Sequence, residues 1–339
     1  MTDGTFVGIH EVAPIPADVV SSQEQALSLW PAIDQHFSTL DRDITRVFLV
    51  GAGGSYLAMV PAQWMLDKYS HIPAVTLNSD EFTYRAPVSV GPGTLVVVLS
   101  GTGNTPESIK AGEWAQSRGA AVVAVTLKAD GPLAQSVKTS FVTETGQGSQ
   151  IVLQLVALAL LKRDGFDVSR FHAALTALPS VLLSALIELE PLAEEIAREM
   201  KDVPVTHVMA SGPLFGAAST FTMCYLQEMQ WKHATTINSD EFFQGPFEVI
   251  DKDTKTIVFL GEDDTRPMGE RVRRFLGTYG GETFYVDSRD IPLQGIEESE
   301  RAFVSPLVFH AWMARLAAHY AAARGYTLEG RRYMWTVEY

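Results

Sequence analysis

A sequence of five residues that occurs twice constrains the fold of this chain more than any other feature. Asn78-Ser-Asp-Glu-Phe82 recurs as Asn238-Ser-Asp-Glu-Phe242, at an offset of 238 − 78 = 160 residues. At the same offset and without gaps, the apolar segment 94–100 aligns with a second apolar segment at 254–260. Self-similarity at one fixed offset indicates duplication. The sequence therefore predicts two similar domains in tandem.

Strand and helix patterns alternate along the chain, which predicts the α/β fold class. Segments 94–100 and 120–127 are continuous β-branched runs, as expected for strands covered on both faces, and 107–118 between them is typical of a crossover helix. We therefore expect two domains, at residues 30–170 and 195–339, each a parallel sheet flanked by helices. Further strands are expected at 46–50, 74–79 and 205–210, and further helices at 149–163, 170–200 and 303–324.

The composition limits the partners and the compartment. Lys and Arg number 26 and Asp and Glu 40, a formal net charge of −14 at pH 7, so a nucleic-acid partner is not expected. Cys224 is the single cysteine, which excludes an intramolecular disulfide. The start, MTDGTFVGIHEV, lacks the basic and apolar regions of a signal peptide, and the longest apolar run, 151–161, is too short to cross a bilayer. We expect a cytoplasmic protein without a membrane partner.

A hydroxyl-rich loop leaves a predicted central strand and enters a helix. Ser100, Thr102 and Thr105 supply hydroxyl donors, while Gly101 and Gly103 let a ligand approach the backbone. A helix N-terminus adds N–H groups and a dipole that favours an anion. One such residue alone would indicate only a helix cap in a turn. Three hydroxyls in six residues at the carboxyl end of a central strand instead predict a phosphate-binding loop.

The equivalent loop of the second repeat is chemically different. Gly261-Glu-Asp-Asp-Thr265 places three adjacent carboxylates where the first repeat has neutral donors. Those charges would repel a phosphate. We therefore expect that the two halves have diverged, one towards an anion site and the other away from it.

A glycine-rich turn follows the first predicted strand. Gly51-Ala-Gly-Gly-Ser55 has the spacing G-x-G-G, whereas a dinucleotide fingerprint has G-x-G-x-x-G, and the expected ribose-binding acid is not obvious. A dinucleotide cofactor is therefore not expected. We interpret Gly53, Gly54 and Ser55 as a turn that faces a sugar.

The segment Tyr225–His233 has apolar residues at helical spacing and predicts a helix that carries Glu228. One interpretation of Glu228 is an ordinary exposed or salt-bridged glutamate. A partly buried Glu228 would instead have a raised pKa and suit proton transfer on a sugar. His233 is a further candidate, although histidines in such positions are more often structural.

These features resemble the SIS (sugar isomerase) family over roughly residues 30–339. Ser100 to Thr105 matches the family's phosphate loop, and Gly53 to Tyr56 resembles its first sugar-contacting turn. Glu144 to Gln150 looks like the segment before the family's long helix, which implies that Ser149 contacts the sugar. The resemblance implies two tandem SIS domains, each a flavodoxin-like parallel sheet flanked by helices, which bind a phosphorylated sugar or sugar-amine.

The segment from Glu228 to Pro246 resembles the isomerase half of glucosamine-6-phosphate synthase, in which a helical glutamate is followed sixteen residues later by a histidine. Here that position is Gln244, so the residue associated with ring opening is replaced. The C-terminal tail, Arg331 to Tyr339, has no lysine where the synthase carries one, and Tyr333 is the nearest match. The resemblance implies Glu228 and Gln244 as catalytic candidates and Tyr333 as a substrate contact.

The pattern QEMQW…EFFxGPFEV and the ending RRYM…VEY are most similar to the fructosamine-6-phosphate and fructoselysine-6-phosphate deglycases. This branch splits 6-phosphofructosyl-amine (Amadori) compounds into glucose 6-phosphate and an amine, and the resemblance implies a homodimer and no metal or other cofactor. Three alternatives stay open. They are aldose–ketose isomerisation or amino-sugar-phosphate deamination at the same site, a non-catalytic phosphosugar sensor, and a structural or interaction protein.

Overall fold

The computed structural model describes residues 11–338. The segment 1–10, on which the absence of a signal peptide was argued, and Tyr339 lie outside the described residues. The described part of the chain divides into two compact units. The first unit comprises Asp18–Ser180 and Gly295–Leu307, and the second unit contains Val181–Gln294 and the segment that begins at Val308.

The limits between the two units fall inside two long helices, α9 (Ser169–Met200) and α12 (Glu298–Arg324). Residues 295–307 belong to the first unit, and the domain bounds 30–170 and 195–339 stay a prediction. Helix α9 has the length and mean hydropathy of a membrane span, 1.6 over its most apolar stretch, but half of that stretch is buried inside the protein. We interpret α9 as a core helix, because side chains such as Leu175 are fully buried.

The first unit contains a five-stranded parallel sheet in the order β2-β1-β3-β4-β5. Its strands are β1 (Arg46–Gly51), β2 (Ala74–Asn78), β3 (Thr94–Leu99), β4 (Ala121–Thr126) and β5 (Thr139–Val142). Every residue of β3 is buried, which explains its continuous apolar run. Gly51 pairs with Asn78 on one side and with Leu99 on the other, so three strands end level with one another. The strand order reverses between β1 and β3, where open α/β sheets bind their ligands.

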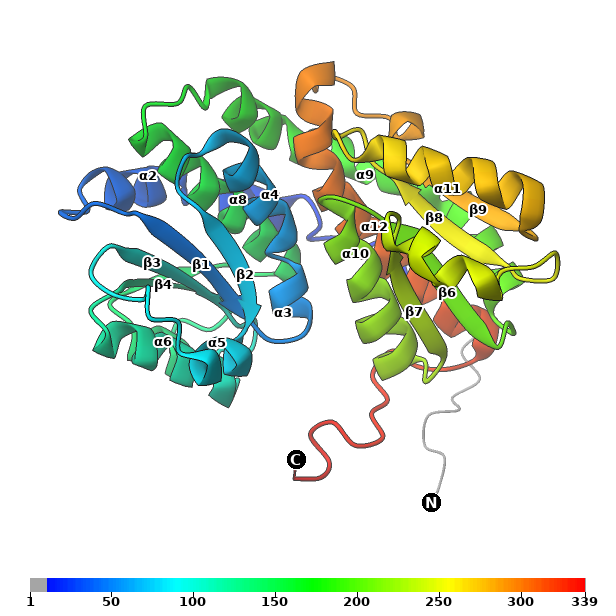
Figure 1. Ribbon diagram of the computed structural model, residues 1–339, viewed down its shortest axis with the longest axis horizontal. Coiled ribbons are helices and arrows are strands. Elements are labelled where there is room, and N and C mark those ends of the chain that lie inside the picture. The colour runs from blue at the N-terminus through cyan, green and yellow to red at the C-terminus, as the bar shows by residue number, and fades with distance from the viewer. Residues whose placement is uncertain (1–10, 339) are drawn as a thin grey trace. The chain divides into compact units, whose positions relative to one another are not determined.

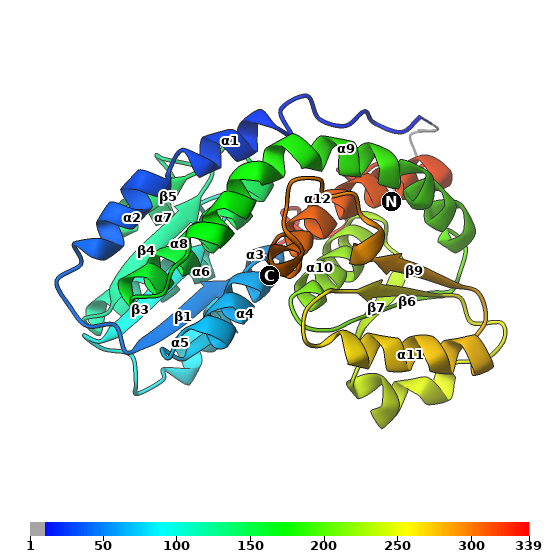
Figure 2. The same ribbon diagram turned by 90° about the horizontal axis from the view of Figure 1, so that it is seen from above.

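Helices cover both faces of this sheet (Figures 1 and 2). On one face, Phe82, Ala111 and Leu133 join the core of the sheet. They belong to α5 (Ser79–Arg85), α6 (Pro106–Ser117) and α7 (Pro132–Ser136). The other face is covered by α4 (Val60–Tyr69) and α8 (Gly146–Arg163), and α1 (Ser21–Leu27) and α2 (Trp30–Ser38) pack on α8.

The second unit contains a smaller parallel sheet in the order β7-β6-β8-β9. Its strands are β6 (Val205–Ala210), β7 (His233–Asn238), β8 (Thr256–Leu260) and β9 (Thr283–Asp287). Phe242, Val272 and Leu276 pack against one face of this sheet. The shorter helices of the unit are α10 (Leu214–Thr220), the π-helix η1 (Phe221–Met229), α11 (Arg266–Tyr279) and the 3-10 helices η2 (Glu241–Gln244), η3 (Pro246–Val249) and η4 (Ser288–Asp290).

The strand pairing of the first sheet recurs in the second with a shift of one residue in the first strand. In the first unit, Val50 of β1 pairs with Leu77 of β2. In the second unit, Met209 of β6 pairs with Ile237 of β7. Ile237 lies 160 residues after Leu77, and Met209 lies 159 residues after Val50. In the first sheet the strand order reverses between β1 and β3, and in the second sheet it reverses between β6 and β8. The repeat seen in the sequence is thus a repeat of strand pairing.

The helix expected at 225–233 is only partly present. Helix η1 ends at Met229, and His233 is instead the first residue of β7. Trp231, between them, has a left-handed φ of 50°, a conformation in which a right-handed helix cannot continue. The prediction of a helix through His233 was therefore wrong.

Candidate functional site

The hydroxyl-rich loop, residues 100–105, joins β3 to α6 and is braced from within; we call it the donor loop. Ser100 is buried, and its Oγ lies 2.9 Å from Thr105 Oγ1 and accepts a hydrogen bond from the Gly103 amide at 3.2 Å. Thr102 is exposed. Thr105 is the N-cap residue of α6 and makes no side-chain hydrogen bond to that helix. The start of α6 therefore stays open to an anion.

Two glycines let the donor loop pack closely against the rest of the first unit. Gly103 has a φ of 68°, and a Cβ there would lie 2.9 Å from Thr126 Oγ1. A Cβ on Gly101 would lie 2.9 Å from the end of the Leu127 side chain. Because φ at Gly103 is also left-handed, that position is the more constrained of the two. The sequence predicted that these glycines let a ligand approach the backbone. In the structure they also allow the close packing that holds the hydroxyls in place.

The turn after β1 lies at the same edge of the sheet as the donor loop. Strands β1 and β3 are adjacent and parallel, so the segments that follow Gly51 and Leu99 emerge side by side. Gly53 has φ 57° and ψ −127°, a conformation that L-residues rarely adopt, and α3 (Gly54–Leu57) begins directly after it. Ser55 in α3 is half-buried. The structure thus brings the predicted sugar-facing turn beside the predicted phosphate loop.

Ser149 lies in the first turn of α8, which follows β5. It is buried, and its Oγ lies 2.8 Å from Thr143 Oγ1 and donates to the carbonyl of Thr145 at 3.3 Å. The Thr145 side chain caps α8 by accepting a hydrogen bond from the Gly148 amide. The Ser149 hydroxyl therefore has partners within the protein, and its contact with a sugar stays a prediction.

In the second unit, the acidic loop, residues 261–265, carries its own anion. Asp263 is 5% exposed, and its Oδ1 accepts hydrogen bonds from the Thr265 amide at 2.9 Å and from the Thr265 hydroxyl at 2.6 Å. A Cβ on Gly212 or on Gly261 would collide with this carboxylate. The loop before α11 thus contains a buried carboxylate, whereas the donor loop before α6 contains neutral hydroxyls, and neither helix has a side-chain cap. This difference agrees with the expected divergence of the two loops.

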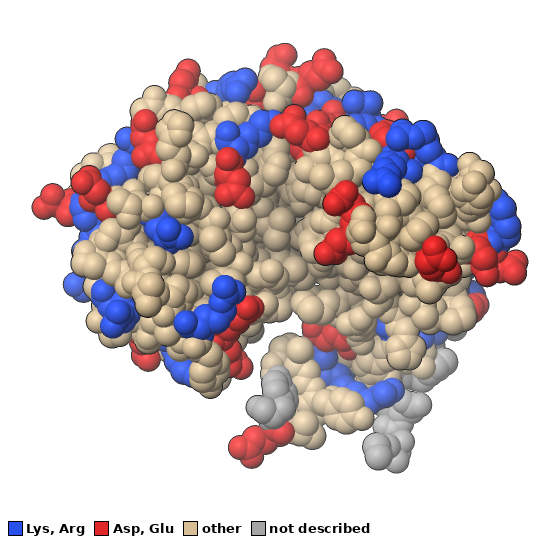
Figure 3. Space-filling model, viewed as in Figure 1, with Lys and Arg blue, Asp and Glu red and all other residues tan. Residues whose placement is uncertain are grey.

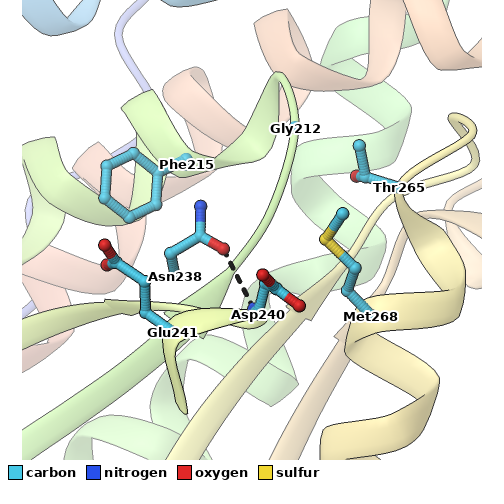
Figure 4. A pocket seen from close by; sticks show the side chains of 7 residues that line it. All are labelled: Gly212, Phe215, Asn238, Asp240, Glu241, Thr265 and Met268. Atoms are coloured by element: carbon cyan, nitrogen blue, oxygen red, sulfur yellow. Dashed lines mark hydrogen bonds between the residues drawn. The ribbon is translucent and has the colours of Figure 1, made fainter. Parts of the chain in front are cut away.

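A pocket of about 480 Å³ opens at the carboxyl edge of the second sheet. In Figure 4 the carboxylates of Asp240 and Glu241 lie on the same side of this pocket as Asn238, with Thr265 and Met268 opposite. Asn238 Oδ1 accepts a hydrogen bond from the Asp240 amide at 3.0 Å. Two carboxylates make this pocket unsuitable for a phosphate.

Glu228 projects from η1, a π-helix, which is a rare geometry that is frequent at functional sites. Its Oε1 lies 2.8 Å from Arg331 Nη2, and 21% of its side chain is exposed. Burial raises the pKa of Glu228 above its ordinary value, while the charge and the hydrogen bond of Arg331 oppose that rise. Glu228 is thus both salt-bridged and partly buried. A carboxyl group with a raised pKa suits proton transfer.

The other residues expected near Glu228 lie on separate elements. Gln244 is the last residue of η2 and is exposed, and His233 is exposed at the amino end of β7. Tyr333 is 64% exposed in the C-terminal tail. The roles of these three residues stay predictions. Arg331, which contacts Glu228 directly, was missed by the sequence analysis, which took only Tyr333 from the tail.

Basic side chains do not gather into one patch on the face drawn in Figure 3, where Lys and Arg are interspersed with Asp and Glu. The formal net charge of −14 would repel an anion at long range. An anionic ligand must therefore be held by local donors, such as the hydroxyls of the donor loop.

Comparisons with known proteins place the chain in a family. The SIS domain matches residues 42–162, which lie within the first unit. Fructosamine deglycase FrlB of Bacillus subtilis is 34% identical over 313 residues, which cover 88% of this chain and 94% of that protein. Fructoselysine 6-phosphate deglycase of Escherichia coli is 25% identical over 297 residues, which cover 86% of each chain.

A solved structure extends the similarity to the fold. A crystal structure from Bacillus subtilis, of a protein described provisionally as a phosphosugar isomerase, has a TM-score of 0.87 and 32% identity, and the match covers 93% of this chain and 100% of that one. The chain belongs to the SIS domain family. Its relatives there are the fructosamine and fructoselysine 6-phosphate deglycases, as the sequence analysis concluded. The expected α/β fold with parallel sheets flanked by helices is confirmed.

Proposed function

We propose that this chain is a phosphosugar deglycase, which cleaves 6-phosphofructosyl-amine compounds to glucose 6-phosphate and a free amino acid or amine. The observation that carries the proposal is the partly buried, ion-paired Glu228, in a chain that is 34% identical to a fructosamine deglycase over 94% of that protein. The open start of α6 and the braced hydroxyls of the donor loop support it, because such an arrangement suits a phosphate.

Two tandem SIS domains belong to the same proposal, the first at 30–170 with the phosphate loop and the second at 195–339 with the catalytic glutamate and the tail. The repeated strand pairing supports it. So does a glycine with left-handed φ after the first strand of each sheet, Gly53 at 57° and Gly212 at 55°. A homodimer and a cytoplasmic location are inferred from the resemblance to the family.

In the proposed mechanism, the donor loop anchors the 6-phosphate. The hydroxyls of Ser100 and Thr105 are already held 2.9 Å apart, and the exposed Thr102 adds a third. Hydrogen bonds to an ionised phosphate are stronger than those between neutral groups, so neutral donors suffice despite the acidic surface. The turn at Ser55 contacts the sugar, together with Ser149 and Tyr333.

Glu228 then transfers a proton between two neighbouring carbons of the open-chain ketosamine. The carboxylate removes a proton from C1, the electron pair forms a C1–C2 double bond, and the C2 carbonyl oxygen takes up a proton from water. The protonated Glu228 returns a proton to C2 while the nitrogen lone pair forms the double bond to C1, which leaves a protonated Schiff base at C1 and a hydroxyl at C2. The hydroxide left by the water takes the N–H proton and gives the neutral Schiff base. Water hydrolyses the Schiff base to the aldehyde of glucose 6-phosphate and the free amine. One carboxylate serves both carbons because they share one face of the intermediate.

Ring opening precedes these steps, and Gln244 stands where the resemblance implies a histidine. Gln244 cannot exchange a proton near neutral pH, but its amide can orient a sugar hydroxyl. Proton transfer to the ring oxygen then falls to His233, to Glu241, to water or to the spontaneous reaction. Whichever group acts, substrate supplied in the open-chain form would react without the ring-opening step.

The experiment that tests the proposal measures release of glucose 6-phosphate by the purified protein. The panel contains 6-phosphofructosyl derivatives of several amino acids, with fructose 6-phosphate and glucosamine 6-phosphate as competing substrates. The matched control is the same panel of fructosyl amino acids without the 6-phosphate, because these lack only the group that the donor loop is proposed to hold.

Each outcome is informative. Turnover of the phosphorylated Amadori compounds alone supports a deglycase, and the best substrate identifies the amine. Turnover of only the simple phosphosugars contradicts the proposal and indicates an isomerase or a deaminase. Binding of all sugars without turnover contradicts it as well and indicates a phosphosugar sensor.

A further inference from the structure

The C-terminal tail carries a guanidinium that is built against the candidate catalytic carboxylate. Arg331 Nη2 lies 2.8 Å from Glu228 Oε1, and only 11% of the Arg331 side chain is exposed. Arg331 Nη1 donates to the carbonyls of Leu328 and Gly330, each at 2.9 Å. These bonds fix the guanidinium in one orientation, unlike those of exposed pairs between flexible side chains.

One hydrogen-bond donor of Arg331 is left without a partner, which distinguishes this arrangement from a fully hydrogen-bonded structural ion pair. Arg331 Nε is buried and has no hydrogen-bond partner in the protein. A buried donor without a partner costs free energy. The ring of Trp335 lies 5.3 Å from Arg331 Cζ and provides a cation–π contact but no acceptor for that N–H group. The geometry therefore favours a guanidinium held for its effect on Glu228.

Burial and the charge of Arg331 act on Glu228 in opposite directions. Burial raises the pKa of Glu228, and Arg331 lowers it. Without Arg331 the carboxyl group would be protonated up to a higher pH. A protonated carboxyl group cannot accept a proton from a sugar, so the charge of Arg331 extends the pH range in which Glu228 can act as a base.

Helix η1 carries and contacts further charged and titratable groups. Helix α10 has none. On η1 itself, burial raises the pKa of Tyr225 to about 12, and Cys224 lies beside it in the sequence. Tyr320 packs against Phe221 of η1, and Tyr326 packs against Trp231. Further groups nearby are Arg324 and Lys232, which donate to backbone carbonyls, Arg332, which lies over the Trp231 ring, and the exposed His233.

We propose that Arg331 is a positioning residue, which orients the Glu228 carboxylate and keeps it ionised for proton transfer. The inference rests on the proposed function, in which Glu228 is the base. It gives the C-terminal tail a role in the reaction through a residue that does not itself touch the substrate.

The test is the pH profile of kcat/KM for glucose 6-phosphate release by the wild type and by Arg331→Gln, Arg331→Lys and Arg332→Gln. Loss of the positive charge raises the pKa of Glu228, so the acid limb of Arg331→Gln moves to higher pH by about one unit, a loss of about tenfold on that limb. Arg331→Lys keeps the charge and moves the limb less. Arg332→Gln, the matched control at the adjacent exposed residue, leaves it in place.

An acid limb that stays in place in Arg331→Gln overturns the proposal, and so does an equal shift in Arg332→Gln. A loss by the same factor at every pH indicates a merely structural role and also overturns it. A double-mutant cycle of Glu228→Gln and Arg331→Gln in urea unfolding needs no substrate: non-additive effects support the pair, and additive effects contradict it. If the wild type releases no glucose 6-phosphate, the proposed function fails, while the cycle still decides the contact.

Discussion

Replacing Asp263 with Ala removes the buried carboxylate of the acidic loop, which precedes α11. This carboxylate accepts hydrogen bonds from the Thr265 amide at 2.9 Å and from the Thr265 hydroxyl at 2.6 Å. A hydrogen bond to a charged group contributes about 1.5–3 kcal/mol net. Because both bonds share one acceptor and water can replace part of them, Asp263→Ala should lower the free energy of unfolding by about 2 kcal/mol.

Urea unfolding followed by circular dichroism measures this loss, and hydrogen exchange at the Thr265 amide locates it. Asp263→Asn keeps an acceptor without the charge and should lose about 1 kcal/mol, half as much. Asp253→Asn removes the same charge from an exposed turn and should stay within about 0.5 kcal/mol of the wild type. Wild-type stability in Asp263→Ala, or unchanged exchange at Thr265, would refute the view that this loop carries its own anion.

Two further predictions concern the folding of each unit. Gly53→Ala should lower the stability of the first unit by about 1–3 kcal/mol through backbone strain alone, because the new Cβ would meet nothing within 4 Å. Thermal melting measures this loss. The control is Gly146→Ala, a position that has equal space for a Cβ and no left-handed φ. In the second unit, burial acts to raise the pKa of Asp287, but hydrogen bonds from Arg266 and from the Arg289 amide outweigh it and hold the pKa below the ordinary 3.8. The stabilisation is therefore present above pH 3.8 and is lost as the pH falls through the lower folded value. Asp287→Asn should cost about 3 kcal/mol at neutral pH, with a difference from the wild type that shrinks in acid; a difference independent of pH in urea unfolding would contradict this sign.

The strands that the sequence predicted best are those with both faces buried. The run 94–100 became β3, Thr94–Leu99, because a continuous β-branched segment of that length has few alternatives. Strands β5 and β9 were not predicted. They have four and five residues, with half-buried and buried positions mixed, and are strands because β4 and β8 pair with them. Pairing between distant segments leaves no local signal.

The end of η1 shows a different limit of the sequence. Apolar residues at helical spacing predict a helix but do not distinguish a π-helix from an α-helix. They also do not reveal the left-handed φ of Trp231, which ends the helical path before His233. A left-handed conformation in a residue other than glycine is uncommon and depends on tertiary contacts.

Some parts of the candidate site could be predicted from the sequence and others could not. The donor loop and the turn at Gly53 could be predicted because each lies within one short segment at a strand end. The pair of Glu228 and Arg331 joins residues 331 − 228 = 103 positions apart, so no motif contains both. The acidic loop was predicted to repel phosphate, but the sequence did not show that Asp263 is buried and hydrogen-bonded to Thr265 within that loop.

The measurement that tests the central claim most directly compares glucose 6-phosphate release by the wild type and by Glu228→Gln. Glu248→Gln, an exposed glutamate of the same unit, is the control. Proton transfer by a positioned residue contributes about 10²–10⁴-fold, so Glu228→Gln should lose at least 100-fold in kcat on 6-phosphofructosyl amino acids and still bind glucose 6-phosphate as the wild type does. A loss well below 100-fold, or the same loss in Glu248→Gln, would remove Glu228 from the mechanism.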